Sequence, residues 1–206
     1  MKLHDSFVRR QLEVMSGVAD KVTLSTARKA QDAAGSLIRF THRNEVVEHE
    51  REKNGMRAVI TVPRDELRGG IILYLHGGGY ACGSLDYVRG CASMISAELG
   101  IRVFAPEYRL APEHPYPAAL DDAMDAYGHL LSSGYDPSRI ALCGDSAGGG
   151  LCYALCQKLR DKGRTLPAGI IAISPWTDMT MSSPSYEINK KDDPSMTVEK
   201  IGRAHV

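Results

Sequence analysis

Residues 140–149 read Ile-Ala-Leu-Cys-Gly-Asp-Ser-Ala-Gly-Gly, and this stretch decides the fold because an apolar run leads through a small-residue turn into a helix-like segment. Within it, Gly144-Asp145-Ser146-Ala147-Gly148 matches the pattern G-x-S-x-G. In that pattern a sharp strand-to-helix turn exposes the serine hydroxyl above the sheet, and the glycines allow close backbone approach. The following helix N-terminus favours negative charge. The pattern predicts Ser146 as a nucleophile; the alternative is a glycine-rich turn that Ser146 merely caps.

A second glycine-rich segment, His76-Gly77-Gly78-Gly79, directly follows the apolar run that ends at Leu75. Such a loop can donate backbone N–H groups to the oxyanion of a tetrahedral intermediate, each worth about 3 kcal/mol of barrier. The alternatives are a flexible turn and an anion-binding nest for phosphate. Two such motifs, in this order and each after a strand, favour acyl-transfer chemistry. We expect His76 to shape the loop, because the general base of such sites follows the nucleophile in the chain.

The remaining sequence predicts an α/β fold in which a hairpin leads into a doubly wound sheet. Apolar residues have helical spacing over 7–17 and 24–34, and Thr23 or Ser25 could cap the second segment. Asn54-Gly55 joins two strand-like runs into a predicted hairpin. The predicted strands are 46–52, 56–62, 71–75, 102–105, 139–143 and 169–174, and the predicted later helices are 88–99, 117–131, 147–162 and a short stretch over 197–204. The later strands are continuously apolar, which is typical of parallel strands covered on both faces.

Composition excludes several other classes of protein. Lys+Arg and Asp+Glu both number 25, so no net charge directs the chain to nucleic acid or an anionic membrane. The apolar runs are far shorter than the roughly 20 residues of a membrane span, and the N-terminus does not resemble a signal peptide. The five cysteines form no C-x-x-C pair, and we expect them to be small buried hydrophobes. These features predict a cytoplasmic protein with no metal and no cofactor.

Four blocks of sequence together resemble the hormone-sensitive-lipase-like esterase family of the α/β-hydrolase superfamily, over about residues 45 to 180. The blocks are His76-Gly-Gly-Gly79 followed by Tyr80; Tyr108-Arg109-Leu110-Ala111-Pro112-Glu113 with Pro115, Pro117 and Asp121; Gly144 to Gly149; and Ser174-Pro175-Trp176-Thr177-Asp178. From the residues alone, the block from Tyr108 is interpreted as a rigid turn braced by Arg109 and Glu113.

The resemblance implies a mostly parallel α/β-hydrolase-type sheet flanked by helices, with N-terminal cap helices over an acyl pocket. It implies Ser146 as nucleophile and N–H groups of Gly78, Gly79 and Ala147 as oxyanion donors. The residues that support these motifs are His76, Gly77, Gly144, Asp145 and Gly148.

The resemblance also places the acid of the triad after a seventh strand and its histidine after an eighth, and this sequence stops at Val206, before either. We therefore expect one α/β-hydrolase domain whose last two strands are missing. Its parts are cap helices in 1–40, a core in 45–180 and a truncated tail in 181–206. We interpret His205 as a tail residue, not as the base. The strand near 170–173 would then be an apolar edge open to self-association.

The leading hypothesis is a carboxylic ester hydrolase that cleaves small short-acyl esters through an acyl-serine intermediate, impaired by the missing groups. The alternative is a catalytically silent module that keeps the oxyanion pocket and only binds a ligand. A nucleotide-phosphate binder is disfavoured, because the glycine loops lack the Lys-Ser/Thr of a P-loop and no dinucleotide fingerprint is present.

Overall fold

The structure is a computed structural model that describes residues 23–53, 55–65, 68–180 and 182–189. The helices predicted over 7–17 and 197–204 lie outside these residues, as does Asn54 of the predicted hairpin turn. Within the described part of the chain, no helix is both long and apolar enough to cross a membrane.

The described residues form a mixed sheet of six strands in the order β1-β2-β4-β3-β5-β6. The strands are β1 (Val46–Lys53), β2 (Met56–Pro63), β3 (Ile71–Leu75), β4 (Arg102–Pro106), β5 (Ile140–Asp145) and β6 (Gly169–Ile173). The pairs β1/β2 and β2/β4 are antiparallel, and the pairs that join β4, β3, β5 and β6 are parallel. The predicted hairpin and the predicted parallel core are therefore both confirmed.

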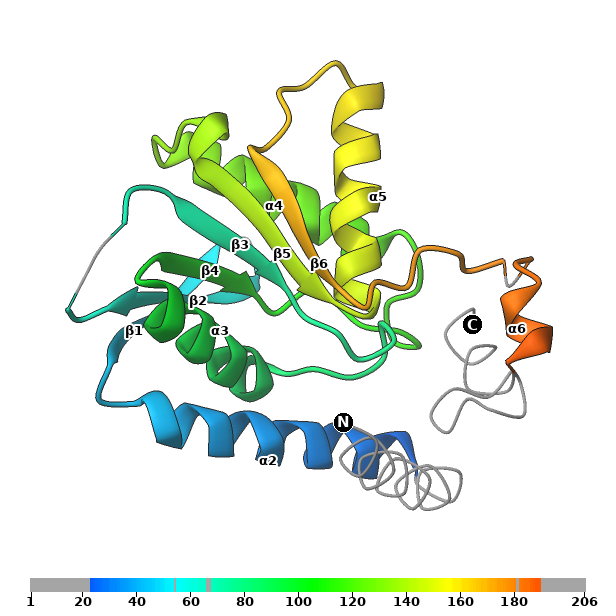
Figure 1. Cartoon of the computed structure of the whole chain (residues 1–206), viewed down its shortest axis with the longest axis horizontal. Coiled ribbons are helices and arrows are strands. Elements are labelled where there is room, and N and C mark those ends of the chain that lie inside the picture. The colour runs from blue at the N-terminus through cyan, green and yellow to red at the C-terminus, as the bar shows by residue number, and fades with distance from the viewer. Residues whose placement is uncertain (1–22, 54, 66–67, 181, 190–206) are drawn as a thin grey trace.

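Helices cover the two faces of this sheet (Figure 1). On one face α4 (Ala118–Ser132) and α5 (Ala147–Asp161) pack on a core that includes Leu73 and Leu142. On the other face α3 (Leu85–Leu99) packs on Ile72 and Tyr74. Successive residues of a strand point to opposite faces, so all five residues of β3 are buried. This double coverage is the reason for the continuous apolar runs in the sequence.

Several helices begin or end at positions different from those predicted. Helix α2 (Leu24–His42) begins, as predicted, after Thr23, whose hydroxyl accepts from the Thr26 N–H at 3.3 Å. It continues beyond the predicted end at Ala34, because Gly35 is a packing contact and not a stop signal. Helix α3 begins at Leu85 and not at Val88, because the side chain of Ser84 caps it there. The short elements Pro137–Arg139, a 3-10 helix, and α6 (Ser185–Ile188) were not predicted.

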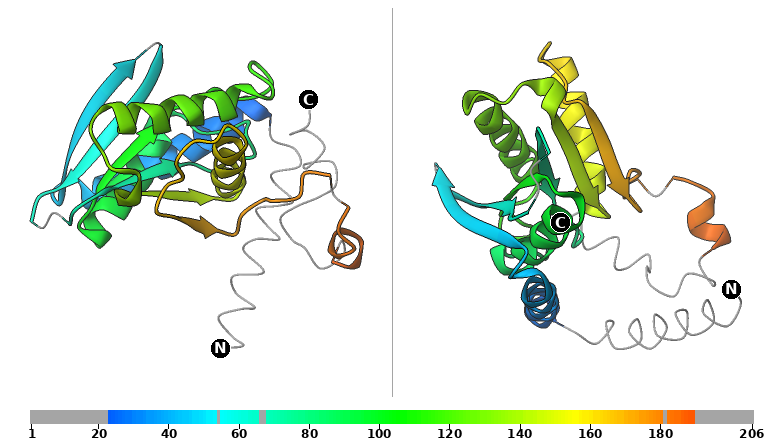
Figure 2. Two further views of the ribbon diagram at one scale, coloured as in Figure 1. Left: turned by 90° about the horizontal axis from the view of Figure 1, so that it is seen from above. Right: turned by 60° about the vertical axis from the view of Figure 1, so that its left-hand side comes forward.

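Helix α2 packs mainly on α3, which makes it an outer layer (Figures 1 and 2). The crossing is made at two glycines. A Cβ on Gly35 would lie 2.3 Å from the Cα of Tyr87, and a Cβ on Gly90 would lie 2.1 Å from the Gly35 carbonyl oxygen. Such distances leave no room for a larger residue without movement of one helix.

We expect Gly35→Ala to lower the free energy of unfolding by about 1–2 kcal/mol, because overpacking against backbone outweighs the better helix propensity of alanine. Gly128→Ala in α4 is the matched control. A Cβ there would meet nothing within 4 Å, so we expect it to raise stability by up to about 1 kcal/mol. Thermal and urea unfolding measure both. Equal stabilisation by the two alanines would contradict a tight contact at Gly35.

Candidate active site

Ser146 occupies the turn between β5 and α5 in a strained backbone conformation, with φ 50° and ψ −120°. L residues adopt this region only when their surroundings enforce it. The enforcing contacts are backbone hydrogen bonds. The Ser146 N–H donates to the Ile173 carbonyl at 2.9 Å, and its carbonyl accepts from the N–H of Trp176 at 2.8 Å and of Gly150 at 3.1 Å. The end of β6 and the segment after it therefore hold the turn in place, and Ser146 remains half-exposed.

The small residues around Ser146 allow three backbone segments to approach one another. A Cβ on Gly148 would lie 2.0 Å from the carbonyl oxygen of Leu75 and 2.4 Å from that of His76. A Cβ on Gly144 would lie 2.5 Å from the carbonyl group of Gly148. The close backbone approach predicted for these two glycines is present in the structure. It brings the start of α5 against the end of β3.

The Asp145 carboxylate joins the two glycine-rich motifs. Its Oδ1 accepts from the Gly77 N–H at 3.0 Å and from the Tyr74 hydroxyl at 2.7 Å. A Cβ on Gly77 would lie 2.2 Å from Oδ2 and 2.9 Å from the carbonyl oxygen of Asp145, so a larger residue would displace this contact. From the sequence, Asp145 and Gly77 are identified only as members of their motifs. Their direct bond needs the parallel pairing of β3 with β5, which no local pattern specifies.

The loop after Gly77 turns back on itself. Gly78 has φ 122° and Gly79 has φ 62°, both in the region that favours glycine. The Gly78 carbonyl accepts from the N–H groups of Ala81 at 3.1 Å and Cys82 at 2.9 Å. Within the described part of the chain, the N–H groups of Gly78 and Gly79 donate to no backbone acceptor. The N–H of Ala147, the first residue of α5, has no partner inside its own helix.

His76 is fully buried and is packed as part of this loop. Its ring stacks on Tyr108 at 4.1 Å, and its Nδ1 bonds the Gly77 carbonyl at 2.7 Å. A carbonyl only accepts, so Nδ1 carries a proton. Burial lowers the pKa of His76 to about 4, so the ring is neutral at physiological pH. This packing supports the expectation that His76 shapes the loop.

The block from Tyr108 to Glu113 is braced, but by partners that the sequence did not reveal. The Tyr108 hydroxyl donates to the His76 carbonyl at 2.6 Å. The guanidinium of Arg109 pairs with the buried carboxylate of Asp122 at 2.7 Å. Glu113 pairs with Arg28 of α2, also at 2.7 Å. The block therefore connects the glycine loop both to α4 and to the outer helix.

Asp178 serves a local turn after β6. Its carboxylate accepts from the N–H of Thr180 at 2.9 Å and of Ser182 at 3.2 Å, and the bonds from Thr180 hold its pKa below the ordinary value. The indole of Trp176 donates to the Asp178 carbonyl at 3.1 Å. The segment predicted to follow the sixth strand therefore does so, and the Trp176 N–H bonds the Ser146 carbonyl in the turn between β5 and α5.

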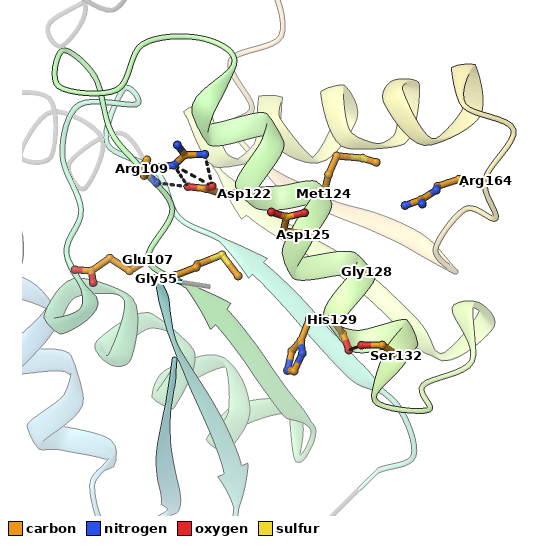
Figure 3. Close-up of a pocket in the computed structure, with 11 residues that line it drawn as sticks. Gly55, Glu107, Arg109, Asp122, Met124, Asp125, Gly128, His129, Ser132 and Arg164 are labelled. Carbon is orange, nitrogen blue, oxygen red and sulfur yellow. Dashed lines mark hydrogen bonds and ion pairs between the residues drawn. The ribbon is translucent and has the colours of Figure 1, made fainter. Parts of the chain in front are cut away.

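Two cavities lie near the two glycine-rich motifs, and neither is lined by residues 76–79 or 144–149. A cavity of about 560 Å³ is lined by one side of α4, by Gly55 and Met56 of the hairpin, and by charged groups that include Asp125 and the Arg109–Asp122 pair (Figure 3). A more apolar cavity of about 320 Å³ is lined by Tyr80 and Leu151 among others. Neither cavity is lined by Ser146, Gly78 or Gly79.

The cysteines and acidic groups offer no metal centre among the described residues, where no group of three His, Cys, Asp or Glu is suitably placed. All five cysteines are free. The expectation that all five are buried is wrong for Cys82 and Cys156, which are half-exposed. Cys82 lies in the loop after the glycines, and Cys156 of α5 packs against the core while only partly buried.

Comparisons with known proteins agree with this geometry. A family model described as alpha/beta hydrolase fold matches residues 72–205. An acetyl-hydrolase of Streptomyces hygroscopicus is 47% identical over 122 residues, covering 59% of this chain and 41% of that protein. An ethyl acetate hydrolase of Pseudomonas putida is 39% identical over 132 residues, covering 61% of this chain and 42% of that protein. The chain thus spans less than half the length of both relatives.

A solved structure extends the likeness to three dimensions. The crystal structure of an esterase from the bacterial hormone-sensitive lipase family superposes with a TM-score of 0.83 at 36% sequence identity. The superposition covers 96% of this chain and 67% of that chain.

The neutral, buried His76 predicts a specific dependence of stability on pH. Between the ordinary pKa of 6.5 and the folded value of about 4, the unfolded chain binds more protons at His76 than the folded chain. Its contribution, about 3 kcal/mol, is therefore complete above pH 6.5 and is lost as the pH falls toward 4. As the pH falls from 7 to 4, the unfolding midpoint of wild type should approach that of His76→Asn, because the variant lacks this contribution. The midpoint of His114→Asn, at an exposed site, should change with pH in parallel with that of wild type. Parallel curves for His76→Asn would contradict the shifted pKa.

Proposed function

This chain belongs to the hormone-sensitive-lipase-like esterases of the α/β-hydrolase fold, and we propose that it carries the acyl-transfer site of a carboxylic ester hydrolase with Ser146 as nucleophile. The observation that carries the proposal is the strained, half-exposed turn of Ser146, bound through Asp145 to the loop of Gly78 and Gly79. An ordinary helix cap needs neither a serine with a positive φ nor a second glycine loop bonded to it.

In the proposed reaction, the Ser146 Oγ adds to the ester carbonyl carbon and gives up its proton. The carbonyl oxygen becomes an oxyanion that accepts hydrogen bonds from the N–H groups of Gly78, Gly79 and Ala147. The carbonyl then re-forms as the carbon–alkoxy bond breaks, and the alkoxide leaves as the alcohol with the proton that Ser146 gave up. Water then hydrolyses the acyl-Ser146 to the free acid and the serine hydroxyl. The oxyanion donors act most strongly in the tetrahedral state, where the negative charge develops.

For substrates we propose small esters with short acyl groups. The two relatives named above are an acetyl-hydrolase and an ethyl acetate hydrolase, and both names describe two-carbon acyl groups. The chain needs no metal or cofactor for this chemistry. We assign no residue of the chain as general base, and a serine without its base is a poor nucleophile at neutral pH. We therefore propose turnover far slower than that of a full-length relative.

We further propose that the chain is one hydrolase domain in which α2 forms the described part of the cap predicted over residues 1–40. The contacts of α2 with the glycine loop support this division. We also propose that the chain resides in a reducing compartment such as the cytoplasm, because its five cysteines are free and form no C-x-x-C pair.

A fluorophosphonate probe tests the proposed nucleophile. We expect one covalent adduct on Ser146 in the folded chain, located by mass spectrometry of the digest, and none after unfolding. Ser146→Ala should not be labelled, and p-nitrophenyl acetate should be hydrolysed slowly by wild type and not by this variant. Absence of an adduct on Ser146 in wild type would favour a silent binding module instead.

Two glycine variants and one histidine variant refine that test. Gly78→Val should abolish labelling, because its Cβ would lie 2.3 Å from the Cys82 carbonyl oxygen at a φ of 122°. Gly79→Asn is the control: its Cβ meets nothing within 4 Å, and asparagine tolerates a positive φ. Equal labelling of Gly78→Val and wild type would exclude this loop as the oxyanion hole. Full esterase rates that His205→Ala abolishes would identify His205 as the base.

The free edge of β6 is the basis of a proposal about assembly. Among the described residues β6 pairs only with β5, and Ile171 and Ile173 are 47% and 55% exposed. The strand contains no charge and no proline. Unpaired apolar edges of this kind pair with further strands. We propose that the chain self-associates through β6.

Light scattering over a concentration series tests self-association. We expect the mean mass of wild type to rise with concentration and that of Ile171→Lys to rise much less, because a charge on an edge strand opposes pairing. Leu37→Lys, at a site that is 67% exposed on α2, is the matched control and should behave like wild type. A wild-type monomer at all concentrations would exclude association through this edge.

A further inference from the structure

Helix α2 touches the glycine loop through polar side chains of its first turns. The Nε of Arg28 donates to the Ala81 carbonyl at 2.7 Å, and its Nη2 donates to the Ala111 carbonyl at 3.1 Å. The same guanidinium forms a bidentate pair with Glu113, both bonds being 2.7 Å. One turn further, Gln31 Nε2 donates to the Gly77 carbonyl at 3.3 Å.

The hydrogen bonds to the Gly77 carbonyl also orient the Gly78 N–H, because both groups belong to one peptide unit. The Gly77 carbonyl and the Gly78 N–H belong to one planar trans peptide, so they point in opposite directions. The carbonyl is held by His76 Nδ1 at 2.7 Å and by Gln31. Anything that fixes this carbonyl therefore fixes the direction of the Gly78 N–H on the opposite side of the plane.

The next peptide unit is controlled in the same way. The Gly78 carbonyl, which shares its plane with the Gly79 N–H, accepts from the N–H groups of Ala81 and Cys82. Arg28 holds the Ala81 carbonyl at the end of that turn. The turn is also held from the Tyr108 block, because the Ala111 N–H donates to the Tyr80 carbonyl at 2.8 Å.

We propose that Arg28 and Gln31 of α2 are positioning residues, which fix the backbone carbonyls of the glycine loop so that the Gly78 and Gly79 N–H groups are held in a single orientation. The inference rests on the proposed function in one respect only, namely that these N–H groups are oxyanion donors. Neither side chain touches the reacting atoms in this assignment. Both act through the loop.

The need for external positioning follows from the composition of the loop. Three successive glycines have more backbone freedom than any other tripeptide, so ordering them has a high entropic cost. Arg28 satisfies several acceptors from one planar group, which a lysine cannot do. Its hydrogen bonds lower the pKa of Glu113 to about 2, so this partner is ionised throughout the neutral range.

Docking of α2 and positioning of the loop can be separated by experiment. The helix is also held at Gly35 and by an ion pair of Arg39 with Glu48 at 2.8 Å. Arg39 belongs to the same helix and has the same kind of partner, but it does not contact the glycine loop. Arg39→Met is therefore a matched control for Arg28→Met, since both remove one charged contact of α2.

The experiment is hydrogen exchange by mass spectrometry on the folded full chain, followed in peptides that cover residues 77–83. We expect exchange in this segment to accelerate at least tenfold in Arg28→Met and several-fold in Gln31→Leu. Arg39→Met should change it less than twofold, and Arg28→Lys should give an intermediate rate. Unchanged exchange in Arg28→Met, or equal acceleration in Arg39→Met, would overturn the proposal.

The rate of fluorophosphonate labelling at Ser146 supplies a second measurement. We expect it to fall at least tenfold in Arg28→Met at saturating probe, with the half-saturating probe concentration changed less than twofold. If Arg28 only held α2 in place, Arg28→Met and Arg39→Met would lower the labelling rate by the same factor. If the exchange results hold while Ser146 is unlabelled in every variant, the positioning role stands and the proposed esterase function fails. A wild-type labelling rate in Arg28→Met together with accelerated loop exchange would also overturn the proposal, because loop order would then not control the N–H donors.

Discussion

The close approach of Gly148 to the carbonyl oxygens of Leu75 and His76 is the constraint on which the rest of the site depends. It places the start of α5 directly on the end of β3. Ser146 must then turn from β5 into α5 within one residue, and this accounts for its positive φ. A side chain at Gly148 would separate α5 from β3, and with it the serine from the glycine loop. Backbone contact, more than any side-chain bond, defines this arrangement.

Polar bonds then stabilise a geometry that the backbones permit. Asp145 bonds Gly77 across the two parallel strands, and the buried ring of His76 fills the space between that loop and Tyr108. Outside them, Arg28 reaches from α2 to the far end of the loop. Each layer holds the one inside it. A loop of three glycines has little order of its own, so its conformation is imposed from its surroundings.

Much of this could be predicted from sequence because the signals are local. The double coverage of β3 appears as five consecutive apolar residues, and the turn at Ser146 appears as glycines at fixed spacing. The boundaries that were wrong have equally local reasons. Gly35 looks like the end of a helix, yet it is the place where α2 touches α3. Ser84 caps α3 one turn before its apolar periodicity becomes clear.

The sequence by itself determined the fold class, the strand-to-helix turn at Ser146 and the glycine loop at residues 77–79, because steric needs at a single turn restrict which residues can stand there. Only the tertiary structure decided which groups meet. Gly77 bonds Asp145, which lies 68 residues away in the sequence, and Arg28 bonds Glu113, which lies 85 residues away. No periodicity encodes such pairs, since they depend on strand order and on how α2 crosses α3. The neutral state of His76 is likewise tertiary, because burial among segments distant in the chain lowers its pKa.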